Sequence, residues 1–138
     1  MKKNKHMLPL LLSAAQFAIP HFNKDPRNFW LGAVGLRSDG AYVSSRNGAV
    51  FYSSSVEKYQ LHTNSHAEGR LLRKLGKNGI VYVARVFRKD RNLAMARPCS
   101  MCQIKLRAFN VEKVYYTIDE HHYGIWYPKK YRDKIIEC

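Results

Sequence analysis

The chain has 138 residues, the size of one domain, and we expect a single domain over residues 1–138. Its content of 46% hydrophobic and 12% aromatic residues excludes an intrinsically disordered chain. The 24 Lys and Arg residues outnumber the 10 Asp and Glu residues, and the resulting net charge of +14 favours a polyanionic partner such as nucleic acid, with a generally basic solvated surface as the alternative.

Residues 7–19 are mainly apolar and follow a short basic stretch, so they have two interpretations. One is a signal peptide, and the other is a first helix that packs on the domain. Pro9 interrupts the run early, and no small-x-small cleavage site precedes a polar stretch. We therefore predict a first helix, followed by a loop over residues 20–28.

The next segments predict a β-hairpin and then a loop. Residues 29–36 and 41–46 are apolar runs on either side of the Ser-Asp-Gly sequence at residues 38–40. Two short strands around Asp-Gly are typical of a tight hairpin. Residues 47–64 are polar and rich in serine, without a clear period, so we predict a loop there.

Two helices and a central strand follow. The leucines of residues 66–75 are spaced for one buried helical face, and Gly76 stands where a helix of this length would end. Residues 80–87 are β-branched, aromatic and almost continuously apolar, which predicts a strand covered on both faces. Residues 88–97 form a basic loop, and a proline opens a second helix over residues 99–109.

The last part predicts two strands and a terminal helix. We expect strands over residues 111–118 and 123–127, a turn over residues 119–122 and a helix over residues 128–137. The short link makes these two strands antiparallel. The alternation of strands and helices predicts an α/β fold, a three-layer α/β/α sandwich with a mixed five-stranded sheet.

The three cysteines argue against a disulfide scaffold, because their number is odd and Cys99 and Cys102 are too close to staple a fold. They predict a reduced compartment, and we expect a cytoplasmic protein. No run reaches the roughly 20 apolar residues of a membrane span, so no membrane partner is expected.

Cys99 and Cys102 are three residues apart, which places both sulfurs on one side of the first turn of the predicted helix. The positive end of the helix dipole favours thiolates there. Thiolates with an imidazole suit Zn²⁺ and leave a fourth position for water. A packed pair, a redox couple or half of a four-cysteine structural site would look alike, but no second Cys-x-x-Cys exists and Cys138 stands alone.

The imidazole is found 33 residues earlier, in the sequence His66-Ala67-Glu68, also at the start of a predicted helix. His-Ala-Glu followed by Pro-Cys-Ser-Met-Cys at residues 98–102 resembles the signature of zinc-dependent nucleobase deaminases, the cytidine-deaminase-like superfamily. Either half alone is a weak signal, and the two in this order are a strong one. The resemblance covers about residues 29–127.

The resemblance implies that His66, Cys99 and Cys102 bind zinc and that Glu68 is a proton shuttle that does not touch the metal. Zinc with two thiolates and a neutral imidazole is formally neutral. A nearby carboxylate can therefore take the proton of the water and deliver it to the ring nitrogen and the departing ammonia. Without the resemblance, Glu68 would be an ordinary acid of a first helical turn and His66 a residue that caps the helix.

By the same resemblance, Asn47 contacts the sugar of the substrate and the backbone of Ala67 helps to hold the base. A turn asparagine before Gly48 explains Asn47 equally well. Relatives that act on free cytidine carry Asn-x-Glu-Asn at this place, and residues 46–49 here lack the acid. The expected hairpin at residues 111–127 resembles the branch of cytidine deaminases and disfavours adenosine. His62, four residues before His66, is interpreted as a loop histidine near the pocket.

Basic residues concentrate between the two motifs. Residues 70–107 hold 11 Lys and Arg against one acid, Asp90. The loop that leads into the second motif helix predicts contacts to a nucleic-acid backbone from Arg88, Lys89, Arg91 and Arg97. Aromatic side chains, such as those of Tyr116, Tyr123 and Trp126, could stack bases, although strand-face or core positions are the simpler explanation.

The sequence therefore predicts a zinc-dependent hydrolytic deaminase that converts cytosine to uracil, with cytosine in single-stranded DNA or RNA as the first candidate substrate. Free cytidine or deoxycytidine, as nucleoside or nucleotide, is the alternative substrate, and an oligomer could close its pocket. A third interpretation is a non-catalytic nucleic-acid-binding module in which zinc is structural.

Overall fold

The computed structural model describes residues 7–19, 28–46 and 67–138, and only the backbone of residues 46 and 67–70. The elements in chain order are α1 (Pro9–Ala18), β1 (Phe29–Leu36), β2 (Tyr42–Arg46), α3 (Ala67–Leu75), β3 (Ile80–Phe87), β4 (Leu93–Ala94), α4 (Ser100–Ala108), β5 (Lys113–Asp119), β6 (His122–Tyr127) and β7 (Arg132–Glu137).

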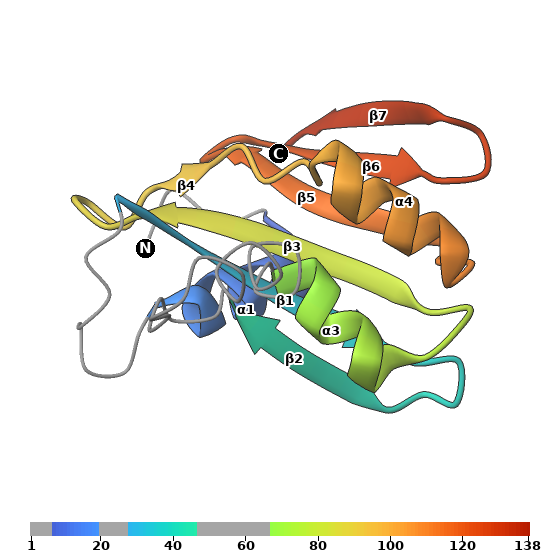
Figure 1. Ribbon diagram of the computed structural model, residues 1–138. Coiled ribbons are helices and arrows are strands. Elements are labelled where there is room, and N and C mark those ends of the chain that lie inside the picture. Colours follow the sequence, from blue (N-terminus) through green and yellow to red (C-terminus); the bar gives the residue numbers. More distant parts are fainter. Residues whose placement is uncertain (1–6, 20–27, 47–66) are drawn as a thin grey trace, which may run out of the picture.

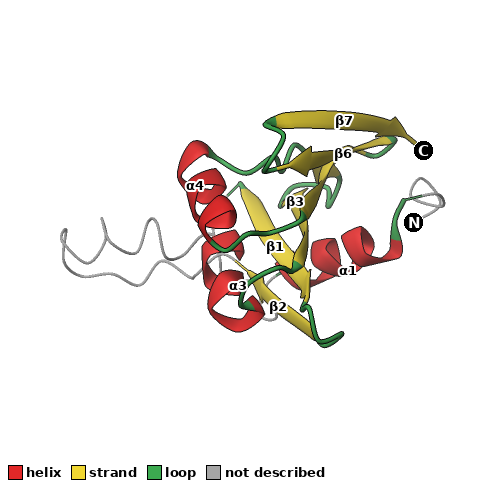
Figure 2. Ribbon diagram, turned by 90° about the vertical axis from the view of Figure 1, so that its right-hand side faces the viewer, coloured by secondary structure: helices red, strands yellow, loops and turns green. Residues whose placement is uncertain are grey.

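The strands form one mixed sheet in the order β2-β1-β3-β5-β6-β7, and β4 pairs with β3 outside this path. The pair β3–β5 is parallel, and the other pairs are antiparallel (Figure 1). Figure 2 shows α1 on one face of the sheet and α3 and α4 on the other. The three-layer α/β/α fold expected from the sequence is confirmed.

β3 is apolar on both faces because each face supports a separate core. Val81 and Val83 belong to the core under α3 and α4, whereas Ala84 and Val86 belong to the core under α1. The prediction of a strand covered on both sides is therefore confirmed. On the α1 side, a Cβ at Gly32 would overlap the carbonyl oxygen of Ala14 and the backbone of the last helical turn, so glycine allows α1 to approach the sheet.

The two predicted hairpins are present. β1 and β2 pair around a turn in which Gly40 has a φ of 92°. β5 and β6 pair antiparallel over a tight link, as expected from its length. Gly76 follows α3 with a φ of 74°, the left-handed conformation anticipated at a helix end. None of the helices in the described segments has the length and apolar character needed to span a membrane.

The predicted terminal helix over residues 128–137 is wrong, because this segment holds a turn and the strand β7. One helical turn does form, since the N–H groups of Lys130 and Tyr131 both donate to the carbonyl of Tyr127. Tyr131 then adopts a φ of 53°, which ends the turn and reverses the chain. β7 pairs with the whole of β6. A second correction concerns the loop 88–97, which contains β4, so the sheet has seven strands rather than five.

β3 and β5 are directly paired only at their amino-terminal ends, from Ile80 to Val83 on β3 and from Lys113 to Tyr116 on β5. Beyond this point β4 enters beside β3. The buried hydroxyl of Thr117 donates to the carbonyl of Ala94 at 2.7 Å and accepts from the N–H of Arg85 at 3.1 Å. The carbonyl of Thr117 accepts from the N–H of Ala96 at 2.9 Å. Thr117 thus ties together the three segments that meet where the strands part.

We expect Thr117→Val to lower the free energy of unfolding by about 2 kcal/mol, because two backbone groups lose their side-chain partner without a change of side-chain shape. Thr117→Ser keeps the hydroxyl and is the matched control, with a smaller loss. Denaturant unfolding of both variants measures the difference. Equal losses in the two variants would mean that the methyl group, and not the hydroxyl, stabilises this junction.

Candidate functional site

α3 and α4 lie on the same face of the sheet and contact each other. Each helix leads into one of the two parallel strands, β3 and β5, and therefore runs back against the strand direction. Their amino-terminal ends accordingly point toward the carboxyl ends of these strands. In open α/β sheets this edge is where ligands bind, so both sequence motifs are placed at the edge suited to a site.

The second motif forms the start of α4. Cys99 is the N-cap residue, with an extended backbone at φ −68° and ψ 166°, and Cys102 lies in the first turn. The amide of Gln103 donates to the carbonyl of Cys99, and its side-chain amide donates to the carbonyl of Pro98, both at 2.8 Å. Cys99 is exposed, whereas Cys102 is 1% exposed and belongs to the core under α4. The predicted helix start is confirmed.

The first motif lies at the start of α3, only partly within the described residues. Ala67 is the first residue of α3 and Glu68 the second, with the backbone alone described. His66, directly before the helix, and Asn47, directly after β2, lie outside the described residues, as does His62. Within the part of the chain that the structure describes, no group of three His, Cys, Asp or Glu side chains is close enough to hold a metal.

The donor set fits zinc at the start of α4. Cys99 and Cys102 are thiols one helical turn apart, and thiolates are ligands that zinc prefers. The N–H groups of the first turn of α4 carry partial positive charge, which stabilises thiolates relative to thiols. The order of the chain places His66 immediately before the neighbouring helix.

Two of the three aromatic residues suggested for base stacking are buried in the core. Tyr116 and Trp126 are each 1% exposed and pack under α4. They cannot stack a base that arrives from solvent, so this suggestion is corrected in favour of core packing. Tyr123 packs against the other core, on the α1 side of the sheet.

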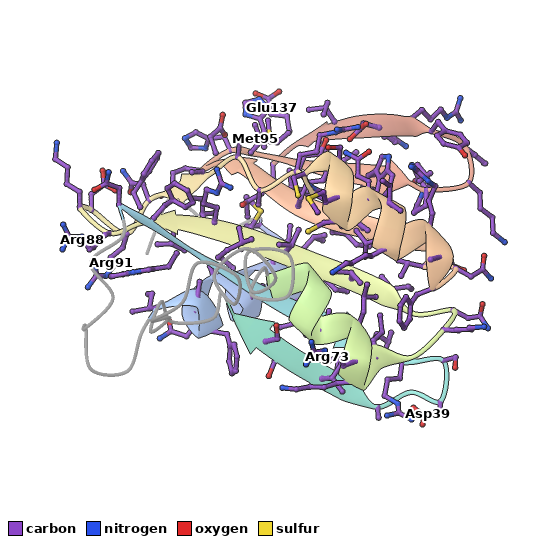
Figure 3. All side chains as sticks on the ribbon, in the orientation of Figure 1. Asp39, Arg73, Arg88, Arg91, Met95 and Glu137 are labelled. Carbon is purple, nitrogen blue, oxygen red and sulfur yellow. The ribbon has the colours of Figure 1, made fainter. Side chains whose placement is uncertain are left out.

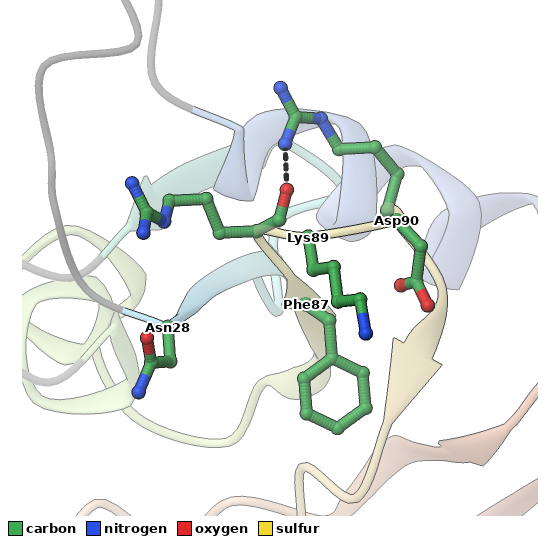
Figure 4. Close-up of a pocket in the computed structure, with 6 residues that line it drawn as sticks. Asn28, Phe87, Lys89 and Asp90 are labelled. Carbon is green, nitrogen blue, oxygen red and sulfur yellow. Dashed lines mark hydrogen bonds between the residues drawn. The ribbon is translucent and has the colours of Figure 1, made fainter.

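The predicted backbone contacts Arg88, Lys89 and Arg91 form the turn after β3. They line an open hollow of about 910 Å³ together with Asn28, Phe87 and Asp90 (Figure 4). The Arg91 guanidinium lies 4.7 Å from the centre of the Trp30 ring and donates to the carbonyl of Arg88.

This basic turn does not lie over the helix starts. It begins five residues beyond Val83, the last residue of β3 that pairs with β5, which amounts to roughly 16 Å along the strand. Figure 3 shows Arg88 and Arg91 at the far end of the sheet, beyond the part covered by α3 and α4. A substrate that reached both places would have to be longer than a nucleoside.

Arg97, the fourth predicted contact, forms an ion pair within the chain. Its Nε and Nη2 donate to the two carboxylate oxygens of Asp133 on β7, at 3.0 and 2.8 Å. The hydroxyl of Tyr116 donates to the same carboxylate at 2.5 Å. The hydrogen bond to Arg97 lowers the pKa of Asp133, and that of Arg97 is raised. Burial raises the pKa of Tyr116, and the bond to Asp133 raises it further.

This cluster fixes the chain two residues before Cys99, so Arg97 positions the start of the second motif in addition to any contact with substrate. Asp133 was not singled out in the sequence, because residues 128–137 were expected to be helical. No local signal identifies it, since Arg97 and Asp133 are 36 residues apart and meet only through the β6–β7 pairing.

Arg85 is a further cation near the motif helices, and the sequence alone did not distinguish it from the other basic residues between the two motifs. It alternates with Val81 and Val83 and therefore lies on the α3 and α4 side of β3. Its guanidinium lies 4.1 Å from the centre of the Phe29 ring. Among the described arginines near the carboxyl end of β3, Arg85 is on the face of the sheet that carries both motif helices.

The fold is similar to that of a solved cytidine deaminase. The cytidine deaminase from Mycobacterium leprae gives a TM-score of 0.54 at 18% identity, over 88% of this chain and 92% of that chain. The cytidine deaminase from Mycobacterium tuberculosis gives 0.48 at 19% identity, over 78% of this chain and 80% of that chain. The sequence matches no protein-family model and no curated protein. The chain has a cytidine-deaminase-like fold, as the resemblance of its motifs predicts.

Asp133→Asn should lower the free energy of unfolding at neutral pH by about 1–2 kcal/mol, a value reduced by the 41% exposure of the Arg97 side chain. The folded-state pKa of Asp133 is lowered, so its contribution is present above the ordinary value of 3.8 and is lost as the pH falls through the lowered folded value. In urea unfolding, the difference between wild type and variant should therefore persist down to about pH 4 and shrink as the pH falls further, through the lowered pKa of Asp133.

Asp39→Asn is the control, because Asp39 also pairs with an arginine, Arg37, at 3.1 Å, but both side chains are largely exposed. A loss in this control as large as that of Asp133→Asn would show that the cluster around Tyr116 has no special role.

Proposed function

We propose that the protein is a zinc-dependent hydrolytic deaminase that converts cytosine to uracil. The observation that carries the proposal is the start of α4, where Cys99 and Cys102 lie one turn apart beside α3, the helix that contains Glu68 and follows His66 in the sequence. The similarity to cytidine deaminase structures supports it at the level of the fold.

In this proposal Cys99, Cys102 and His66 hold zinc, and Glu68 remains available for proton transfer. Zinc supplies the positive charge that makes water an effective nucleophile near neutral pH. Glu68 would take one proton from the attacking water and deliver it to the ring nitrogen of cytosine. It would then pass the second proton, released when the added hydroxyl becomes the carbonyl, to the departing amine. The backbone of Ala67 orients the base, and Asn47 contacts the sugar. In the overall reaction, water and cytosine give uracil and ammonia.

The form in which cytosine is presented has two candidates. The basic turn of Arg88, Lys89 and Arg91 supports single-stranded nucleic acid, because a polymer can reach from the helix starts to the end of β3. The fold of cytidine deaminases and the position of Arg85 support free cytidine or its nucleotide, with Arg85 as a phosphate ligand. We place the polymer first among the candidate substrates because of the net charge of +14.

The proposed thiol ligands stay reduced in the cytoplasm, and we therefore place the protein there.

Glu68→Ala should retain zinc and lose deaminase activity by about a thousandfold or more, because only the proton transfer is removed. The assay is mass spectrometry of a pool of single-stranded and duplex DNA, RNA, cytidine, deoxycytidine and their monophosphates. The product is heavier by 1 Da, and metal analysis reports the bound zinc. Glu112→Ala, an exposed acid at the start of β5, is the control and keeps full activity.

The outcomes of this assay distinguish the three interpretations of the function. Conversion of small molecules alone would remove the polymer as substrate and support a nucleoside or nucleotide deaminase. Retained zinc without conversion of any substrate, in wild type as in Glu68→Ala, would contradict catalysis and leave the nucleic-acid-binding module with structural zinc.

A second prediction tests the basic turn. Neutralising it in the double variant Arg88→Gln/Lys89→Gln should raise KM for a cytosine-containing oligonucleotide and reduce the slope of log(kcat/KM) against log salt by about 1.4, or 0.7 for each lost phosphate contact. Turnover of free cytidine is measured in parallel. Arg73→Gln/Lys77→Gln removes the same charge from exposed positions on α3 and after it, and an equal effect in this control would contradict a local role of the turn.

A further inference from the structure

The α1-side face of the sheet carries a second set of aromatic and basic residues, on β3, β5, β6 and β7. The strand register arranges these residues in adjacent rows. The central row runs across four strands, from Tyr82 through Tyr115 and Ile125 to Lys134. On one side of it lie the pairs Ile80 with Lys113 and Tyr127 with Arg132. On the other side lie Thr117, Tyr123 and Ile136. We call Tyr82, Tyr115, Tyr123 and Tyr127 with their neighbouring cations the tyrosine face.

The rings of Tyr82, Tyr115 and Tyr123 form a cluster that packs in part against the core under α1. The rings of Tyr82 and Tyr115 are stacked, with their centres 4.6 Å apart and their planes 4° from parallel. The Tyr123 ring is 6.3 Å from that of Tyr115, at 46°. All four tyrosines are partly exposed, unlike Tyr116 and Trp126 on the opposite face. The cluster therefore presents aromatic surface to solvent across several strands.

Cations surround these rings. The ammonium of Lys113 lies 5.3 Å from the centre of the Tyr115 ring, and that of Lys130 lies 5.7 Å from the centre of the Tyr127 ring. Arg132 and Lys134 are exposed on β7, at the edge of the sheet. The register places both opposite residues of the α1-side face of β6, Tyr127 and Ile125.

The carboxylates of β7 are on the other face. Asp133 pairs with Trp126 in the register and binds Arg97 on the α4 side, and Glu137 pairs with His122. The alternation of β7 thus separates its charges, with cations toward the tyrosines and carboxylates away from them. In sequence, Asp133 stands between Arg132 and Lys134 but lies on the other face, and Glu112 directly precedes Lys113.

The helix α1 covers only part of this side. It packs on β1, β2 and β3 and makes a smaller contact with β5. Figure 2 shows α1 at the end of the sheet formed by β1 and β2, away from β7. Among the described residues, no helix packs over β6 and β7 on this face.

We propose that the tyrosine face binds single-stranded nucleic acid, by stacking of bases on the tyrosine rings and by contacts of phosphates with Lys113, Lys130, Arg132 and Lys134. Charge complementarity identifies the occupant, because four cations border the rings and the whole chain has a net charge of +14. A four-stranded sheet with aromatic side chains can stack two or three bases. A duplex keeps its bases stacked inside and offers none to the rings.

This surface is separate from the proposed deaminase site, which lies on the α3 and α4 side. The proposal therefore does not rest on deamination, and oligonucleotides without cytosine test it. The probes are fluorescently labelled (dT)20, (U)20 and a DNA duplex of the same length. Their affinity for the whole chain is measured by fluorescence anisotropy at several salt concentrations.

We expect the wild type to bind both single strands and Arg132→Gln/Lys134→Gln to bind them about tenfold more weakly, with a salt slope reduced by about 1.4. Arg73→Gln/Lys77→Gln removes the same charge on the opposite side of the sheet and should change the affinity much less. Tyr115→Leu, which keeps an apolar side chain, should weaken binding by about tenfold with an unchanged salt slope, because it removes stacking rather than charge. Thermal unfolding confirms that each variant is folded.

Three results would overturn the proposal. The first is the absence of binding by the wild type, and the second is equal loss in both charge variants. The third is duplex binding as tight as that of the single strands. Sedimentation without nucleic acid adds a check, because an oligomer that Arg132→Gln/Lys134→Gln dissociates would assign the face to a second copy of the chain.

Discussion

The hydroxyl of Thr117 joins two backbone groups at the place where β3 and β5 part, and the rest of the site depends on this junction. Parallel strands that separate leave N–H and C=O groups without ladder partners, and such groups are costly when buried. β4 enters beside β3 at this place, and the Thr117 hydroxyl bonds one backbone group of each strand, the N–H of Arg85 on β3 and the carbonyl of Ala94 on β4. The chain consequently leaves the sheet at Ala96 and begins α4 four residues later, at Ser100, which places Cys99 and Cys102 above the sheet.

The ion pair of Arg97 with Asp133 extends this junction to the edge of the sheet. Its carboxylate also accepts the hydroxyl of Tyr116, whose ring lies against Gly124, where a Cβ would overlap it. A glycine on β6 therefore lets a core tyrosine reach a carboxylate on β7. Through this contact the last strand supports the start of α4, although the two are far apart in the chain. The two faces of the sheet carry different groups, the motif helices α3 and α4 on one face and the tyrosine face on the other.

Patterns carried by neighbouring residues predicted most of the elements. The hairpin around Gly40, the strand Ile80–Phe87 and the helix start at Cys99 follow from turn chemistry, continuous apolar character and a proline before the helix, which are local signals. The predictions failed where pairing partners decide the conformation. Residues 128–137 carry a proline and mixed charges that suit a helix, but pairing with β6 stabilises a strand. His66, the proposed zinc ligand, and Glu68 are predicted by their motif alone, since His66 lies outside the described residues and only the backbone of Glu68 is described.

The sequence by itself determined which reactive groups the chain carries, because residue types and short spacings are properties of the chain. These groups are two thiols one turn apart, an imidazole just before another helix, a carboxylate in the first turn of that helix, and an excess of cations. The tertiary structure decided which of these groups meet. The alternation of side chains along the strands placed Tyr116 and Trp126 in the core under α3 and α4. The same alternation placed Tyr82, Tyr115 and Tyr123 on the opposite face, the one that α1 covers in part. Strand pairing brought Asp133 to Arg97 across 36 residues. Such contacts depend on register and on which face a strand buries, and neither is encoded within a window of neighbouring residues.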